Sequence, residues 1–126
     1  MARTIIDKLW DEHLVADLGN GASLLYIDRV FLHERTGSVA LKELAAANRR
    51  VRIPEQGFCT MDHLVDTLPG RGDATRMPGG GEFITQTRAA ARAAGITLFD
   101  IGDDRQGIVH VVSPEQGIAL PGVTLV

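Results

Sequence analysis

Cysteine is nearly absent from this 126-residue sequence, in which Cys59 is the only one. A single thiol excludes a disulfide within the chain. It is also too little for a zinc site or an iron–sulfur cluster, because both require several protein ligands. We therefore expect Cys59 to be a small core residue, and we expect no cysteine-based metal site on this chain.

Clusters of basic residues and long apolar runs are also missing. The formal net charge is −3, with lysine and arginine scattered along the chain, whereas nucleic-acid-binding proteins gather positive charge on one surface. No segment reaches the roughly 18 apolar residues of a membrane-spanning helix. The acidic Asp7 near the N-terminus is unlike a signal peptide. These features predict a cytoplasmic protein without nucleic-acid or membrane partners.

The sequence does have the composition of a folded domain. Hydrophobic residues make up 44% and charged residues 23% of the chain, close to the average for globular proteins. Single hydrophobic cores are commonly built from roughly 100–150 residues. Because the apolar run Val123–Val126 ends the sequence without a turn or polar tail, we expect residues 1–126 to be a single domain or a fragment of a longer protein.

Helical periodicity predicts three helices. Thr4 and Asp7 form a capping pattern ahead of apolar residues at helical spacing, so the first helix is expected to begin after Thr4 and to end before Gly19. His13 falls late in this helix, where a surface or helix-end residue is expected. Two further helices are expected over Ser38–Ala47, with Ser38 as a possible cap, and over Glu82–Ala94, which Gly95 ends.

Short apolar runs between these helices predict strands. A long stretch rich in glycine and proline, Leu68–Gly81, is expected to be irregular. Strands that alternate with helices are typical of a layered α/β/α fold with a mainly parallel sheet. The expected strands are Ser23–Ile27, which should be buried, Val51–Ile53, Phe58–Met61, Ile96–Asp100 and Val123–Val126.

Candidate proton-transfer groups stand near turns and predicted strand ends. Three of the four histidines are such candidates. They are His33, which is beside Glu34, His63, which is beside Asp62, and His110. A carboxylate beside an imidazole fixes the tautomer of the ring and favours proton transfer. Neighbours on a strand point to opposite faces, however, so Asp62 and His63 can pair only if the backbone turns there. On these residues alone, polar surface positions remain the simpler interpretation.

Several phrases, in chain order, resemble the aconitase superfamily, and within it the branch of bacterial 3-isopropylmalate dehydratase large subunits. The resemblance covers nearly the whole chain and is weakest over Thr67–Thr85. The phrases that carry it are Thr4–His13, Leu24–Arg29, Thr60–His63, Gln106–His110, Pro114–Gly117 and Leu120–Thr124.

The resemblance implies a hydro-lyase that converts 2-isopropylmalate to 3-isopropylmalate, by dehydration and rehydration, in leucine biosynthesis. It implies a [4Fe–4S] cluster acting as a Lewis acid on cysteines far downstream of this sequence, and a small subunit that supplies the base for the carbon-bound proton. It also implies site residues. Asp62, His63 and His110 match active-site positions, His63 being implicated in handling the departing hydroxyl, and His33 matches a position near bound substrate.

Two alternatives stay open at this point. A related hydro-lyase, such as a homoaconitase or methylmalate dehydratase large subunit, shares all of these phrases. A free-standing, non-catalytic binding or assembly module is favoured by the missing cluster ligands. In either case we expect the 126-residue chain alone to be inactive, and the reading frame after Val126 distinguishes a fragment from a module.

Overall fold

The computed structural model describes residues 2–126. None of the helices in this range is long and apolar enough to cross a membrane. The helices are α1 (Ile5–His13), α2 (Gly37–Ala46), α3 (Gly80–Ala94) and α4 (Val109–Glu115), with a 3₁₀ turn η1 (Pro54–Gln56); the strands are β1 (Leu14–Gly19), β2 (Ala22–Leu25), β3 (Val30–His33), β4 (Gly57–Thr60) and β5 (Thr97–Phe99).

The main sheet has three parallel strands in the order β3-β4-β5. Beyond β3 the end of the chain runs in the same direction, since Phe31 N donates to Val126 O at 2.7 Å and Val126 N donates to Arg29 O at 3.2 Å. The predicted parallel α/β architecture is therefore confirmed. Because all three strands run in one direction, His33, Thr60 and Phe99 end them at the same edge, here called the carboxyl edge.

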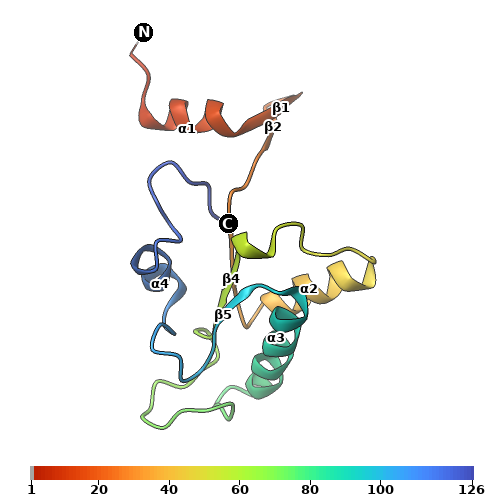
Figure 1. Cartoon of the computed structure of the whole chain (residues 1–126), viewed down its shortest axis with the longest axis vertical. Helices are drawn as coiled ribbons and strands as arrows, with labels where there is room; N and C mark the ends of the chain where they lie inside the picture. The colour runs from red at the N-terminus through yellow and green to blue at the C-terminus, as the bar shows by residue number, and fades with distance from the viewer. Residues whose placement is uncertain (1) are drawn as a thin grey trace.

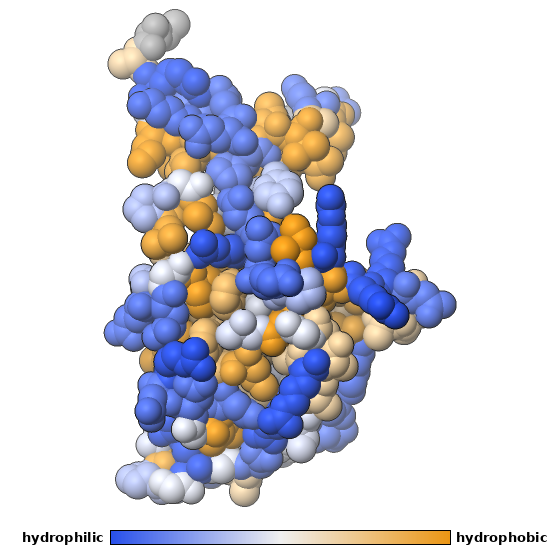
Figure 2. Space-filling model, viewed as in Figure 1, coloured by the Kyte–Doolittle hydropathy of each residue, from blue (hydrophilic) through white to orange (hydrophobic). Residues whose placement is uncertain are grey.

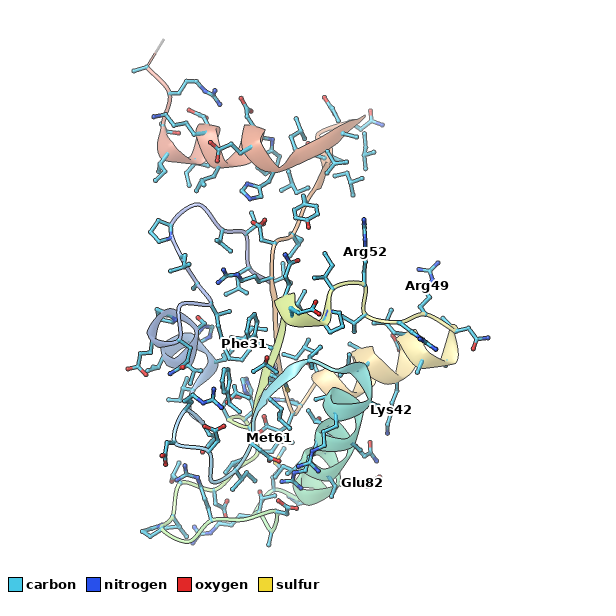
Figure 3. All side chains as sticks on the ribbon, in the orientation of Figure 1. Phe31, Lys42, Arg49, Arg52, Met61 and Glu82 are labelled. Atoms are coloured by element: carbon cyan, nitrogen blue, oxygen red, sulfur yellow. The ribbon has the colours of Figure 1, made fainter. Side chains whose placement is uncertain are left out.

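Helices cover both faces of this sheet. Figure 1 shows α2 and α3 on one side of the strands and α4 on the other. Each side has its own core, and the labelled Phe31 lies within the body of the molecule (Figure 3). The core against α4 contains Phe31, Phe99, Val112 and Ile118, and the core against α2 and α3 contains Leu41, Cys59, Ala91 and Ile96. The expected core position of Cys59 is confirmed, since its side chain has no exposed surface.

The N-terminal part stands apart from the sheet (Figure 1). Its helix begins as predicted, because Thr4 Oγ1 accepts from Asp7 N at 3.2 Å and Asp7 Oδ2 accepts from Thr4 N at 2.8 Å. The helix is shorter than expected, however, and ends at His13. The next residues form β1, which pairs with β2 in an antiparallel hairpin. Asn20 and Gly21, with φ of 53° and 77°, form its tight turn.

Apolar side chains remain exposed over this N-terminal part (Figure 2). The strand expected over Ser23–Ile27 forms as β2, but the prediction that it is buried is wrong. A two-stranded hairpin has no second layer to cover it, so both of its faces meet solvent. The most exposed of these side chains are Ile5, Ile6, Val15 and Leu18.

Other element predictions need correction. Val51–Ile53 is not a strand, because the chain turns there into η1. Val123–Val126 is not a regular strand, because only an isolated parallel bridge between Arg29 and Leu125 forms there, and Val126 is 69% exposed. Ser38 lies inside α2, which has Thr36 at its N-cap and no side-chain cap. Besides β1, two elements, β3 and α4, were not predicted; β3 is too short for a periodic signal, and α4 contains Pro114, which usually argues against a helix.

His13 connects the N-terminal part to the chain end. It is the last residue of α1, as expected of a helix-end residue, but its exposed fraction is 8%, so it does not lie at the surface. His13 Nε2 lies 2.7 Å from Asp28 Oδ2, which also accepts from Thr124 N at 2.8 Å. The pKa of His13 is raised above its ordinary value by its hydrogen bond to the carbonyl oxygen of Leu9 and then by Asp28. His13 is therefore a structural residue at this junction.

Candidate active site

Three of the predicted site residues, His33, Asp62 and His63, lie at the carboxyl edge of the sheet. His33 is the last residue of β3, and Glu34 follows it. Thr60 is the last residue of β4, and Asp62 and His63 follow it after Met61. Parallel α/β sheets place ligand sites at this edge, because loops from neighbouring strands meet there.

Asp62 and His63 form a hydrogen-bonded pair, which the sequence analysis allowed only if the backbone turns at these residues. Asp62 Oδ1 lies 2.5 Å from His63 Nδ1. The side chain of Asp62 is 3% exposed, whereas that of His63 is 39% exposed. An ionised carboxylate can only accept, so Nδ1 carries the hydrogen and Nε2 is left as the working nitrogen. This arrangement is that of an oriented imidazole with a buried carboxylate behind it.

The second oxygen of Asp62 holds the start of α4. Asp62 Oδ2 accepts from Val109 N at 2.8 Å, and nearby Thr60 Oγ1 donates to Gly107 O at 3.0 Å. His110 follows Val109 in the first turn of α4 and is exposed. The structure thus ties the segment that carries His110 to Asp62, but His110 itself lies outside the hydrogen-bonded cluster around His63.

His33 stacks on His63. The two rings have centroids 3.7 Å apart and planes at 8° to each other. His33 Nδ1 is buried and has no hydrogen-bond partner among residues 2–126. Burial, followed by the nearby His63, lowers the pKa of His33 below its ordinary value. His33 is thus expected to be a neutral ring at neutral pH.

Glu34 was not proposed as a site residue from the sequence. It is fully buried, and its Oε2 accepts from Asp62 N at 2.9 Å while its Oε1 accepts from Leu64 N. In the sequence, the only feature that pointed to Glu34 was its position as an acidic residue beside His33. That position suggested a bond from Glu34 to His33, whereas the carboxylate binds the backbone that follows Thr60.

Four side chains of this site could in principle approach a metal ion. One ligand atom from each of His33, Glu34, Asp62 and His63 lies within 4.8 Å of the others. The hydrogen bonds argue against it, because both oxygens of Glu34 and both oxygens of Asp62 are already bonded. Stacked rings also direct their lone pairs side by side rather than toward one point.

The donor set does not fit an iron–sulfur cluster either. Such clusters are held by several thiolates, and the chain has only Cys59. Burial raises the pKa of Cys59 to about 12, so the sulfur is a protonated thiol in the core. Residues 1–126 do not supply a binding site for the cluster.

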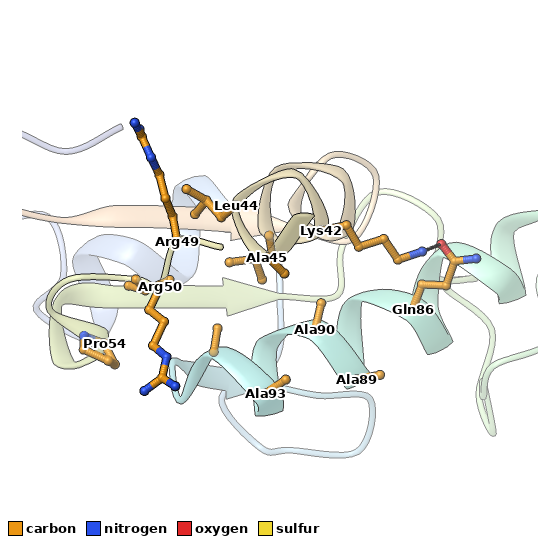
Figure 4. A pocket seen from close by; sticks show the side chains of 13 residues that line it. Lys42, Leu44, Ala45, Arg49, Arg50, Pro54, Gln86, Ala89, Ala90 and Ala93 are labelled. Carbon is orange, nitrogen blue, oxygen red and sulfur yellow. Dashed lines mark hydrogen bonds between the residues drawn. The ribbon is translucent and has the colours of Figure 1, made fainter. Parts of the chain in front are cut away.

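A separate groove of about 700 Å³ lies between α2 and α3. Figure 4 shows alanine side chains such as Ala45 and Ala90 along it, with Arg49 and Arg50 at one end. At the other end Lys42 Nζ donates to Gln86 Oε1 at 2.5 Å. None of the residues at the carboxyl edge described above lines it, so it is distinct from the candidate site.

Comparison with known sequences identifies the family. Residues 7–126 match the profile described as the Aconitase family (aconitate hydratase). The chain belongs to the aconitase family. It is 42% identical over 124 residues to 3-isopropylmalate dehydratase large subunit 1 of Bradyrhizobium diazoefficiens. That match covers 98% of this chain and 26% of the relative, so this aconitase-family chain spans about a quarter of the length of the curated relative that it matches.

Proposed function

We propose that this chain forms part of the large subunit of a 3-isopropylmalate dehydratase and contributes proton-transfer groups to its active site. The resemblance to the relative named above supports this assignment. The observation that carries it is the Asp62–His63 pair, in which a buried carboxylate orients an imidazole whose other nitrogen is open to a ligand.

The chemistry of dehydration explains why this pair is suited to the role. A departing hydroxyl group becomes water by taking a proton, and the Nε2–H of protonated His63 can supply it. Asp62 holds the ring in place through its contact with Nδ1. In the rehydration step Nε2 accepts a proton from the attacking water, so the same nitrogen serves both directions.

His33 and His110 have supporting roles in this proposal. Neutral His33 stacks on His63, and in this proposal it contacts the substrate. His110 is an exposed histidine next to Val109, whose backbone Asp62 binds, and it acts as a second active-site histidine. The acceptor of the carbon-bound proton and the [4Fe–4S] cluster would be held outside residues 1–126, by a small subunit and by cysteines in the rest of the large subunit.

The test is a substrate panel on the full-length large subunit, assembled with its small subunit and reconstituted anaerobically with iron and sulfide. We expect dehydration of 2-isopropylmalate to be much faster than that of citrate, homocitrate or 2-methylmalate. A preference for one of the other acids would indicate that the protein is the large subunit of a related hydro-lyase. No dehydration of any of them would contradict the proposed function.

A further inference from the structure

Glu34 is the least accessible ionisable group of the carboxyl edge. It has no exposed surface and forms no salt bridge with a cation in the range 2–126. A buried carboxylate is costly unless its oxygens are hydrogen-bonded. Both oxygens of Glu34 do accept backbone N–H groups, from Asp62 and Leu64. Its main-chain oxygen accepts from Thr87 Oγ1 at 3.0 Å, which fixes the residue against α3.

These two N–H groups belong to the turn that lets Asp62 meet His63. On a continued strand the two side chains would point to opposite faces. Instead the backbone bends after Thr60, and the amides on either side of His63 point at one carboxylate. Glu34 is therefore the hydrogen-bond acceptor that holds both ends of this turn.

Glu34 also sets the stack between the two histidines. It directly follows His33 on β3, so fixing Glu34 against the turn places His33 beside His63. A carboxylate oxygen of Glu34 lies within 4.8 Å of a ring nitrogen of His63.

We propose that Glu34 is a positioning residue that acts through His63, by holding the 62–64 turn that orients the His63 ring. This inference rests on the proposed function for its catalytic consequence. Its structural part, the control of the His63 ring, stands by itself.

The Glu34→Gln variant tests the requirement for an acid. Glutamine has nearly the same shape, but its NH₂ group would face one of the two backbone N–H donors, so one of these amides loses its acceptor. In the full-length enzyme we expect kcat to fall roughly 10–100-fold with KM nearly unchanged, the usual effect of losing an outer hydrogen-bond partner. The matched control is Glu43→Gln, an exposed glutamate on α2, which should retain wild-type kcat.

A double-mutant cycle distinguishes positioning from general support of the fold. If Glu34 acts through His63, Glu34→Gln should cost little further activity in a His63→Ala background. Losses that multiply would overturn the inference. If Glu34→Gln does not fold, Glu34→Asp, which is too short to reach both amides, takes its place in the same cycle.

A spectroscopic measurement keeps this test independent of activity. Ring ¹⁵N chemical shifts of His63 in the full-length large subunit should report one fixed tautomer in the wild type and a mixture in Glu34→Gln. Unchanged shifts in the variant would overturn the role of Glu34. If the wild-type enzyme dehydrates no hydroxy-diacid, the proposed function fails, and these shifts still decide whether Glu34 controls the ring.

Discussion

His33 and His63 lie face to face, with ring centroids 3.7 Å apart and an angle of 8° between the rings. Two positive charges at this separation repel each other, so the stack favours a state with at most one protonated ring. Asp62 bonds the ring of His63, whereas His33 Nδ1 has no partner among residues 2–126. The stack thus joins a ring that a carboxylate orients to a ring whose lowered pKa keeps it neutral at neutral pH.

Titration of the histidines should show opposite shifts for His33 and His13. Burial lowers the pKa of His33, and the hydrogen bond to the Leu9 carbonyl raises that of His13. In an NMR titration we expect His33 to change charge below about 6.5, the value of a free histidine, and His13 above it. An order with His33 above His13 would contradict these environments.

The same shifts set the pH dependence of stability. The unfolded chain binds a proton at position 33 more readily than the folded chain does, so stability is lost as pH falls from about 6.5 through the folded pKa of His33. His13 has the reverse sign, and its contribution is lost as pH rises through its folded pKa. We expect His33→Asn to weaken the acid-side loss and His13→Asn the loss at higher pH, measured by denaturant unfolding at several pH values.

Cys59 should be unreactive until the protein unfolds. Burial raises its pKa to about 12, and its side chain has no exposed surface. Since thiolates rather than thiols react with iodoacetamide, we expect modification at neutral pH to be slow in the native protein and fast in denaturant, followed by mass spectrometry. Rapid modification of the native protein would show that Cys59 is accessible.

Arg88 should stabilise the loop before α3. Its guanidinium makes paired bonds of 2.7 Å to both oxygens of Asp73 and bonds of 2.6 and 2.9 Å to Asp100 at the end of β5. We expect Arg88→Ala to lower the free energy of unfolding by about 2 kcal/mol, the size of a lost hydrogen bond between charged groups at a partly exposed site.

Arg92→Ala provides the matched control for Arg88. Arg92 is 70% exposed and lies 3.6 Å from Asp100, so its loss should cost less than about 0.5 kcal/mol. Equal effects of the two substitutions in chemical denaturation would contradict the clamp assigned to Arg88.

Local signals in the sequence predicted local structure well. Thr4 and Asp7 form the predicted capping box, and Gly95 ends α3 in a left-handed conformation, with φ of 71°. The Asn20–Gly21 pair follows the predicted end of the first helix, although the same dipeptide is a strong hairpin signal. The sequence thus contained a signal for the hairpin, but the helical pattern of the preceding residues favoured a helix instead.

Contacts between distant residues could not be predicted in the same way. Asp62 and His63 are neighbours, so their pairing needed only a turn. Glu34 bonds residues about 30 positions later, and the bond of His13 to Asp28 depends on where the hairpin returns the chain. Neither contact has a periodic or compositional signal, because each arises only when the sheet brings separate segments together.

The turnover of His63→Ala in the full-length large subunit, assembled with its small subunit and loaded with iron and sulfide, tests the central claim most directly. Loss of a positioned proton donor should lower kcat for 2-isopropylmalate by roughly 10²–10⁴-fold while iron content stays at the wild-type level. His110→Ala should show a loss in the same range, and Gln116→Ala, at an exposed position just after α4, should not. Turnover near wild type in both histidine variants would contradict the account and return His63 and His110 to polar surface positions.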